Sequence, residues 1–284
     1  MTTIGISAKI NSQKALLYAA KTADDLRAQG HSICFDPMTA EALGLGSAEC
    51  HPKSELGAAS QILVTFGGDG TLLSVARYAP RDVPIIGVNM GTLGFLTEIR
   101  VEEFPTLLQD VLEGNFEAEP RVTFDIALSG HGPRDLHFRV LNDAVINKSA
   151  LARIIEMRVE VAGQFVSTFR ADGLIVSTPT GSTAYNLSAG GPIVYPTMRA
   201  VLITPICPHT LTNRPLVLPD SLEIEIGLLT DQPEIYLTLD GQEGLPINDR
   251  SRVRIRRSEE PVLLVQSPNK NYFDVLRRKL KWGE

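Results

Sequence analysis

The chain has 284 residues, a length that accommodates one large domain or two ordinary ones. Hydrophobic residues make up 43% of it and charged residues 21%, which is typical of a soluble globular protein with a sizeable core. With 33 acidic and 27 basic residues the formal charge is −6, which argues against a general nucleic-acid-binding surface, because such surfaces are basic.

The first third of the chain alternates strand-like and helix-like patterns. Asn11 or Ser12 can cap the first helix, Gly30 can end it, and Pro105 suits the first turn of the last helix. In chain order we expect strands at 3–8, 31–36, 61–66 and 83–89, and helices at 11–30, 71–79 and 102–114. Near-continuous apolar strands that alternate with helices predict a parallel, Rossmann-like sheet covered on both faces.

From about Arg121 the pattern changes to short β-rich runs separated by turn residues. Alternation with a period of two predicts an antiparallel, β-rich second domain over 121–267. The runs lie at 121–130, 136–146, 153–163, 164–178, 200–207, 221–229, 234–242 and 251–267. We therefore expect an α/β domain over 1–120 followed by this β-rich domain.

The last residues, 271–284, predict a basic amphipathic helix. Phe273, Leu276 and Leu280 fall on one helical face, and lysines and arginines cover much of the rest. Contact with a membrane surface is one interpretation. A helix docked on the first domain, with its cations favoured by the helix dipole, is the preferred one, so we join 268–284 to that domain.

Cysteine usage and hydropathy indicate the compartment. The three cysteines are far apart and form no C-x-x-C pair, which fits a reducing compartment better than a disulfide framework. The start of the chain lacks the pattern of a secretory signal, and no apolar run is long enough to span a bilayer. We expect a cytoplasmic protein with neither a membrane nor a nucleic acid as partner.

The stretch TFGGDGTLL (65–73) places glycines around one carboxylate, Asp69. It follows a predicted parallel strand, at the edge where open α/β sheets bind ligands. Glycines tolerate positive φ and expose their N–H groups, so the loop suits a phosphate, although it matches neither Walker A nor G-x-G-x-x-G. Asp69 then accepts a proton from a hydroxyl or helps to hold a divalent cation. The alternative is a surface turn that Asp69 caps.

Two further segments carry polar groups that suit a ligand. A second glycine segment, 89–99, is expected beside the first at the same sheet edge, with Phe95 in the core or stacked on a base. The longest motif, FRADGLIVSTPTGSTAYNLSAGGPIV, occupies 169–194. Its hydroxyls, with Tyr185 and Asn186 at the start of a short helix, suit a sugar or phosphate, unless the segment is an inert polar loop.

Three separated motifs, GGDGT (67–71), LNDAVI (141–146) and DGLIVSTPTGSTAYNLSAGGPI (172–193), together resemble the NAD kinase family. PICPHTLTNRPLV and DGQ (240–242) also fit, so the resemblance covers nearly the whole chain and is weakest before residue 60. It implies an α/β domain, a β-rich domain with most of the dinucleotide site, and a C-terminal tail that returns to the first domain. Members transfer the γ-phosphate of ATP to the 2′-hydroxyl of the adenosine ribose of NAD, need a divalent cation such as Mg²⁺, and are commonly homo-oligomers.

The resemblance also implies roles for single residues. Asp69 accepts the proton of the 2′-hydroxyl, and Gly70 lies beside the dinucleotide. Asn142 and Asp143 bind the sugar hydroxyls and the adenine region, and Asp172, which by itself also fits an Asx turn, reads the nicotinamide end. The other expected binding positions are Arg153, Arg170, Thr183, Ala184, Tyr185, Asn186, Leu187, Ser188 and Gln242.

Arg170 carries an additional expectation about the substrate. A fixed cation near the nicotinamide influences the choice between the oxidised and the reduced ring. Members with arginine at this position resemble strict users of NAD rather than enzymes that also accept NADH. The alternative is an ordinary surface arginine.

Three other functions compete with NAD phosphorylation. A lipid kinase of the diacylglycerol type shares the GGDGT loop but requires membrane attachment and does not predict the 169–194 segment. A sugar kinase resembling phosphofructokinase shares only a similar glycine loop. A non-catalytic NAD sensor has no need of Asp69, so the intact loop argues against it.

Overall fold

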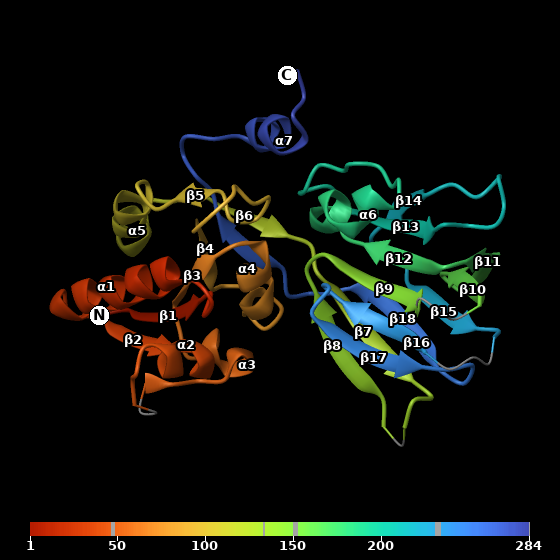
Figure 1. Cartoon of the computed structure of the whole chain (residues 1–284), viewed down its shortest axis with the longest axis horizontal. Helices are drawn as coiled ribbons and strands as arrows, with labels where there is room; N and C mark the ends of the chain where they lie inside the picture. Colours follow the sequence, from red (N-terminus) through yellow and green to blue (C-terminus); the bar gives the residue numbers. More distant parts are fainter. Residues whose placement is uncertain (47–48, 133, 150–152, 231–233, 284) are drawn as a thin grey trace. The chain divides into compact units, whose positions relative to one another are not determined.

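The computed structural model describes residues 1–46, 49–132, 134–149, 153–230 and 234–283 (Figure 1). The chain folds as two compact units. Unit 1 consists of Met1–Pro120 together with Pro261–Glu284, and unit 2 consists of Arg121–Glu260. No helix in the described part of the chain is long and apolar enough to cross a membrane.

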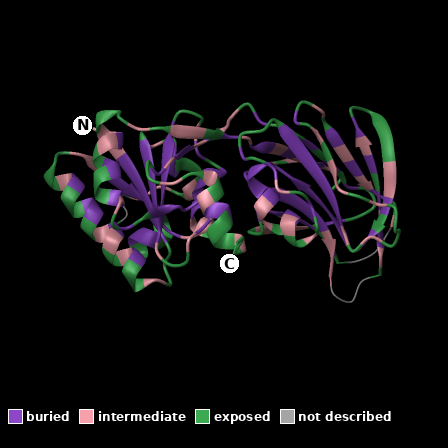
Figure 2. Cartoon of the chain, turned by 90° about the horizontal axis from the view of Figure 1, so that it is seen from above, coloured by how far each residue is buried: buried purple, intermediate pink, exposed green. Residues whose placement is uncertain are grey.

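Unit 1 is built on a seven-stranded sheet with the order β2-β1-β3-β4-β19-β6, in which β5 also pairs with β4. Its strands are β1 (Thr3–Ala8), β2 (Ser32–Phe35), β3 (Ile62–Gly67), β4 (Pro84–Asn89), β5 (Ile99–Arg100), β6 (Ala118–Arg121) and β19 (Val262–Val265). The pairs β1–β2, β1–β3, β3–β4, β4–β5 and β4–β19 are parallel, as predicted for this domain. Strands β1, β3 and β4 are almost wholly buried (Figure 2).

The structure divides the predicted run 251–267 between the two compact units. Residues Arg252–Arg257 form β18 of unit 2, whereas β19 pairs with β4 in the sheet of unit 1. The sequence contains the reason. Arg252–Arg257 alternates polar and apolar residues, as a strand with one solvated face does, while VLLV is uniformly apolar, as strands of a covered parallel sheet are.

The helices of unit 1 are α1 (Gln13–Ala28), α2 (Pro37–Ala42), α3 (Lys53–Leu56), α4 (Asp69–Ala76), α5 (Phe104–Glu113) and α7 (Tyr272–Leu280). The Ser12 side chain caps α1 by accepting a hydrogen bond from the N–H of Ala15 at 3.3 Å. The sequence did not predict α2 and α3, and it placed the start of α4 at Thr71, two residues too late. The consequence for the site is that Asp69 occupies the first turn of a helix.

Helix α7 begins with a capping box formed by Asn271 and Asp274. It returns to unit 1, as expected, but only part of the expected face is buried. Val275 and Leu276 are buried, whereas the Phe273 side chain, expected on the packed face, is 55% exposed.

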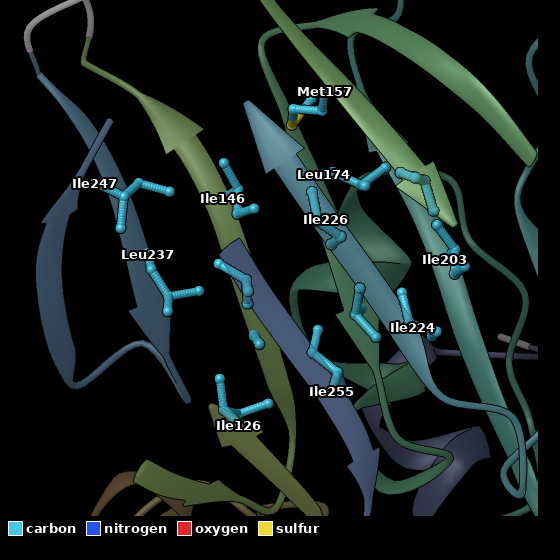
Figure 3. Packing of buried hydrophobic residues seen from close by; sticks show 14 of the residues in the cluster. Ile126, Ile146, Met157, Leu174, Ile203, Ile224, Ile226, Leu237, Ile247 and Ile255 are labelled. Atoms are coloured by element: carbon cyan, nitrogen blue, oxygen red, sulfur yellow. The ribbon is translucent and has the colours of Figure 1, made fainter. Parts of the chain in front are cut away.

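Unit 2 contains two six-stranded antiparallel sheets, with the orders β11-β10-β15-β18-β7-β8 and β14-β13-β12-β9-β16-β17. The strands of the first are β7 (Phe124–Ser129), β8 (Leu136–Val140), β10 (Ile155–Val161), β11 (Gln164–Ala171), β15 (Ile224–Leu228) and β18. Those of the second are β9 (Asp143–Lys148), β12 (Gly173–Ser177), β13 (Ala200–Ile206), β14 (Leu216–Pro219), β16 (Ile235–Leu239) and β17 (Glu243–Ile247). Residues from both sheets, among them Ile126, Ile146, Leu174 and Ile255, pack into one apolar core (Figure 3).

The chain passes from one sheet of unit 2 to the other within two of the predicted strands. The run 136–146 is β8 and β9, separated by Leu141 and Asn142, and the run 164–178 is β11 and β12, separated by Asp172. The two motif positions Asn142 and Asp172 therefore lie at crossings between sheets, where regular strand pairing is interrupted. A 3₁₀ helix, η2 (Thr180–Thr183), and the short α6 (Tyr185–Ser188) follow β12.

Candidate active site

The carboxylate of Asp69 is held by the second glycine segment. Oδ1 accepts hydrogen bonds from the N–H of Leu96 at 3.1 Å, the N–H of Thr97 at 2.9 Å and Oγ1 of Thr97 at 2.9 Å. Oδ2 accepts one hydrogen bond, from the N–H of Phe95 at 2.8 Å. Since each carboxylate oxygen offers about two lone pairs, the remaining capacity to accept a proton lies on Oδ2.

The glycines of the GGDGT loop do not adopt positive φ, so that part of the expectation was wrong, and it is Gly67 that space requires. Gly68 is the N-cap of α4 with an extended backbone, φ −127° and ψ −171°. A Cβ on Gly67 would lie 2.2 Å from Oγ1 of Thr71, whereas a Cβ on Gly68 would meet nothing within 4 Å. The start of α4 is thus bare on the side of Gly68. A helix N-terminus of this kind favours an anion.

The second glycine segment lies beside the first, as expected. The N–H of Met90 donates to the carbonyl of Gly67 at 2.9 Å. The Asn89 side chain, at the end of β4, donates to the carbonyls of Thr92 at 2.7 Å and Thr97 at 3.2 Å. Position 94 requires glycine, because a Cβ there would lie 2.0 Å from Oδ1 of Asp69.

Unit 2 contains a cavity of about 330 Å³ on the sheet that carries β9 and β16. This volume is within the usual range for a small-molecule site. Its lining residues are Asn142, Asp143, Val145, Asn147, Ala184, Tyr185, Thr238, Asp240 and Gly241. The cavity therefore brings together residues of the LNDAVI motif, the start of α6 and the DGQ stretch.

Asp240 shapes this cavity through the main chain. Its Oδ1 accepts hydrogen bonds from the N–H groups of Asn142 at 2.7 Å and Asp143 at 3.2 Å, and its Oδ2 accepts one from the N–H of Leu141 at 3.1 Å. The N–H of Asp240 in turn donates to the carbonyl of Asp143 at 2.9 Å. Asp240 holds the sheet crossing at 141–143 in place, with a left-handed φ of 50° in its own backbone.

The carboxyl of Asp143 is strongly perturbed. Its residue is 4% exposed, and burial, followed by the negative charge of Asp240, raises its pKa to about 7. A carboxyl with this pKa exists at neutral pH in both forms, so it can donate a hydrogen bond as well as accept one.

The segment expected at a helix start divides into two roles. Ala184 and Tyr185 line the cavity, and Tyr185 is partly exposed. The Asn186 side chain is fully buried. It donates to the carbonyls of Ser182 and Pro192 at 3.1 Å each and accepts from Oγ1 of Thr204 at 2.6 Å. Asn186 thus fastens α6 to the sheet, and Thr183, Leu187 and Ser188 are not among the cavity-lining residues.

The charged positions expected at the nicotinamide end form ion pairs. Nε of Arg170 lies 3.1 Å from Oε1 of Glu156, and the Arg170 side chain is 62% exposed. Oδ1 of Asp172 lies 3.5 Å from Nζ of Lys148. Arg153 and Gln242 are exposed, and all four residues lie outside the cavity lining. Their roles in binding stay predictions.

Sequence reasoning missed several groups that build the two sites. It missed the amides of 95–97, which have no side-chain signature, and Asn147 and Thr238, which line the cavity from β9 and β16. Asp240 was noted in the sequence only as part of the DGQ stretch. No cluster of three or more His, Cys, Asp or Glu side chains that could hold a metal occurs in the described ranges.

Comparisons with known proteins agree with this architecture. Residues 4–116 match the model of the ATP-NAD kinase N-terminal domain, and residues 141–267 match that of the ATP-NAD kinase C-terminal domain. An NAD kinase of Geotalea daltonii is 45% identical over the full length of both chains. One of Trichlorobacter lovleyi is 53% identical over 79% of this chain and 80% of its own.

Two solved structures share the fold. An NAD kinase from Archaeoglobus fulgidus, in complex with ATP, superposes with a TM-score of 0.77 at 25% identity and covers 98% of each chain. A yeast NADH kinase, in complex with NADH, gives a TM-score of 0.88 at 24% identity over 100% of this chain and 89% of its own.

Proposed function

The chain belongs to the NAD kinase family, and from this premise we propose which of its residues carry out the reaction. The enzyme transfers the γ-phosphate of ATP to the 2′-hydroxyl of the adenosine ribose of NAD, giving NADP and ADP. The environment of the Asp69 carboxylate is the observation that supports these residue roles. Asp69 is a single carboxylate held by backbone amides at a bare helix start, with one oxygen still able to accept a proton.

Asp69 acts as the proton acceptor for the attacking hydroxyl. A ribose hydroxyl is a weak nucleophile, and phosphoryl transfer depends mainly on positioning and on stabilisation of charge. Oδ2 is the accepting atom, because Oδ1 already has three donors. The N–H groups at the start of α4, with Gly68 and Gly70 beside them, stabilise the negative charge of the phosphates.

The cavity of unit 2 binds the dinucleotide. Asn142 and Asp143 bind ribose hydroxyls and the adenine region, and Tyr185 adds an aromatic side chain to the lining of the cavity. Asp172 and Arg170 act at the nicotinamide end. Arg170 favours the oxidised ring only to the extent that its charge is not already neutralised by Glu156.

A divalent cation, Mg²⁺ in our proposal, accompanies ATP. Magnesium usually keeps several waters and is bound by substrate phosphates with one or two carboxylates rather than by an all-protein cage. We propose that the phosphates of ATP and water hold the cation, while Oδ2 of Asp69 remains the proton acceptor. The cation supplies neutralisation of phosphate charge. Its requirement is tested by the loss of turnover with excess chelator and its return with added Mg²⁺.

We further propose a homo-oligomer in the cytoplasm. The free cysteines Cys34, Cys50 and Cys207 fit a reducing compartment. Sedimentation of the purified protein and fractionation of cells with an antibody test these two statements.

The test of the assignment is the Asp69→Asn variant. NADP formation from ATP and NAD is followed with an NADP-specific dehydrogenase. A parallel assay tests NADH in place of NAD as the acceptor of the phosphate. Loss of a positioned base costs about 10²–10⁴ in rate, so we expect kcat to fall by that factor while NAD still binds. Thr97→Val is the matched control, because it removes one hydrogen bond to Oδ1 and leaves the base in place. Turnover of Asp69→Asn equal to that of the wild type contradicts the proposed role.

A further inference from the structure

The C-terminal segment of unit 1 holds the main chain immediately after the amides that bind Asp69. Nζ of Lys270 donates to the carbonyl oxygen of Glu98 at 2.7 Å. The N–H of Ser267 donates to Oε1 of Glu98 at 2.9 Å. Glu98 follows Thr97 directly, and Thr97 supplies two of the four hydrogen bonds to Asp69. A tail distant in sequence therefore fixes one end of the segment that orients the carboxylate.

Lys270 is held in this position by a second contact. Its Nζ lies 2.7 Å from Oε2 of Glu103, and its side chain is only 8% exposed. Burial raises the pKa of Glu103, but the hydrogen bond from Lys270 and the other favourable contacts outweigh that effect, and the pKa lies below its usual value. Removal of one partner of such a pair leaves the other charge poorly solvated, so the pair holds its geometry firmly.

The same tail reaches the other end of the segment. Nζ of Lys279, on α7, lies 5.4 Å from the centroid of the Phe95 ring, within the range of a cation–π contact. The N–H of Phe95 is the donor to Oδ2 of Asp69, the oxygen with capacity for a proton. The three amides of 95–97 thus lie between two contacts with residues of 267–280.

We propose that the C-terminal segment 267–280 positions Asp69 for phosphoryl transfer, and that Lys270 is the positioning residue on which this depends. The inference rests on the proposed role of Asp69. Lys270 acts through Glu98 on the amides of 95–97, and these orient the carboxylate. A reacting group displaced by about 1 Å can lose about 100-fold in rate, so a contact far from the phosphates can limit kcat.

The test compares Lys270→Met with wild type. Methionine retains an unbranched stem of similar length and removes the charge and all donors. We expect kcat to fall about 10- to 100-fold, with the KM for NAD changed by less than about twofold, since the dinucleotide cavity belongs to unit 2. Lys270→Arg, which keeps the charge and the donors, should recover most of the loss. A change of KM in proportion to kcat, or no recovery by arginine, overturns the proposal.

Two controls separate positioning from loss of folding. Arg27→Met removes a cation that pairs with Asp24 and Glu49, and it should leave kcat unchanged. Circular dichroism gives the folded fraction, to which every kcat is normalised. If Lys270→Met does not fold, Glu103→Gln replaces it, because this change removes only the charge of the partner of Lys270. Glu103→Gln should lower kcat and leave KM unchanged. A wild-type kcat in Glu103→Gln overturns the proposal.

The outcome is distinguishable from failure of the proposed function. An inactive Asp69→Asn with a fully active Lys270→Met refutes only the role of the tail. A fully active Asp69→Asn refutes the base itself.

Discussion

The buried carboxyl of Asp143 makes the stability of unit 2 dependent on pH. Its pKa is about 7 in the folded chain against an ordinary value of 3.8, with burial as the larger cause and Asp240 as the smaller. Between these values the unfolded chain releases a proton that the folded chain keeps. The contribution of Asp143 to stability is therefore fully present below about pH 4 and is lost as the pH rises to about 7.

Replacement of Asp143 by asparagine isolates this effect. The asparagine side chain cannot ionise, and among the described residues none donates a hydrogen bond to the Asp143 carboxyl that the change would break. At roughly 1.4 kcal/mol per pH unit, the two units between pH 5 and 7 correspond to about 3 kcal/mol. We expect the stability of Asp143→Asn relative to wild type to be greater at pH 8 than at pH 5 by about this amount.

The assay must report on unit 2 alone, because a two-unit chain need not unfold in one step. Hydrogen exchange of the β9 and β16 amides, measured by mass spectrometry without ligand and corrected for intrinsic rates, gives the free energy of opening at each pH. Asp249→Asn, at an exposed carboxyl of the same unit, is the control and should give the same difference at both pH values. A difference for Asp143→Asn that changes by less than about 1 kcal/mol between pH 5 and 8 refutes the reasoning.

Two further substitutions test the supports of the sites. Asp240→Asn leaves one acceptor oxygen for three amides, so we expect the KM for NAD to rise about tenfold, which corresponds to the loss of about one hydrogen bond to a charged group. We also expect the pKa of Asp143 to fall, because the neighbouring negative charge is removed. Steady-state kinetics and the pH midpoint of the exchange experiment check the two effects, and an unchanged midpoint speaks against the coupling. Gly94→Ala places a Cβ 2.0 Å from Oδ1 of Asp69 and should lower kcat by about 100-fold, whereas Gly91→Ala, with nothing within 4 Å, should match wild type. Equal kcat values for the two alanine variants would show that the carboxylate tolerates displacement.

The first sheet could be predicted from the sequence because its central strands are apolar. Strands β1, β3 and β4 are buried along almost their whole length, so their residues form the apolar runs typical of a covered parallel sheet. The pairing of β19 with β4 was not predicted, because β4 lies far earlier in the chain and no local pattern encodes that pairing. The crossings at Asn142 and Asp172 were interpreted as continuous strands for a similar reason. The chain is extended on both sides of each crossing while the pairing partner changes.

The site was predictable where side chains carry the chemistry and unpredictable where the backbone does. The sequence pointed to Asp69 by residue type and loop position, and to Asn142 and Asp143 through the family resemblance, and the roles of all three stay predictions. The donors to Asp69 include the main-chain amides of 95–97, which any residue except proline supplies. The tail residue Lys270 was not predicted to have a role, since its partners Glu98 and Glu103 lie far from it along the chain.

In both units, hydrogen bonds from consecutive main-chain amides hold a carboxylate against a turn of the main chain. Asp69 accepts hydrogen bonds from the consecutive amides of 95–97, and Asp240 accepts them from those of 141–143. Consecutive amides share a rigid backbone, so a carboxylate bound to three of them cannot rotate without breaking several bonds at once. The two differ in what remains available. Asp240 is 7% exposed and supports its neighbours, while Asp69 is only partly buried and keeps one lone pair on Oδ2. Orientation without full burial is what a proton acceptor requires, because its position is set before substrate arrives while the accepting atom stays within reach of a hydroxyl.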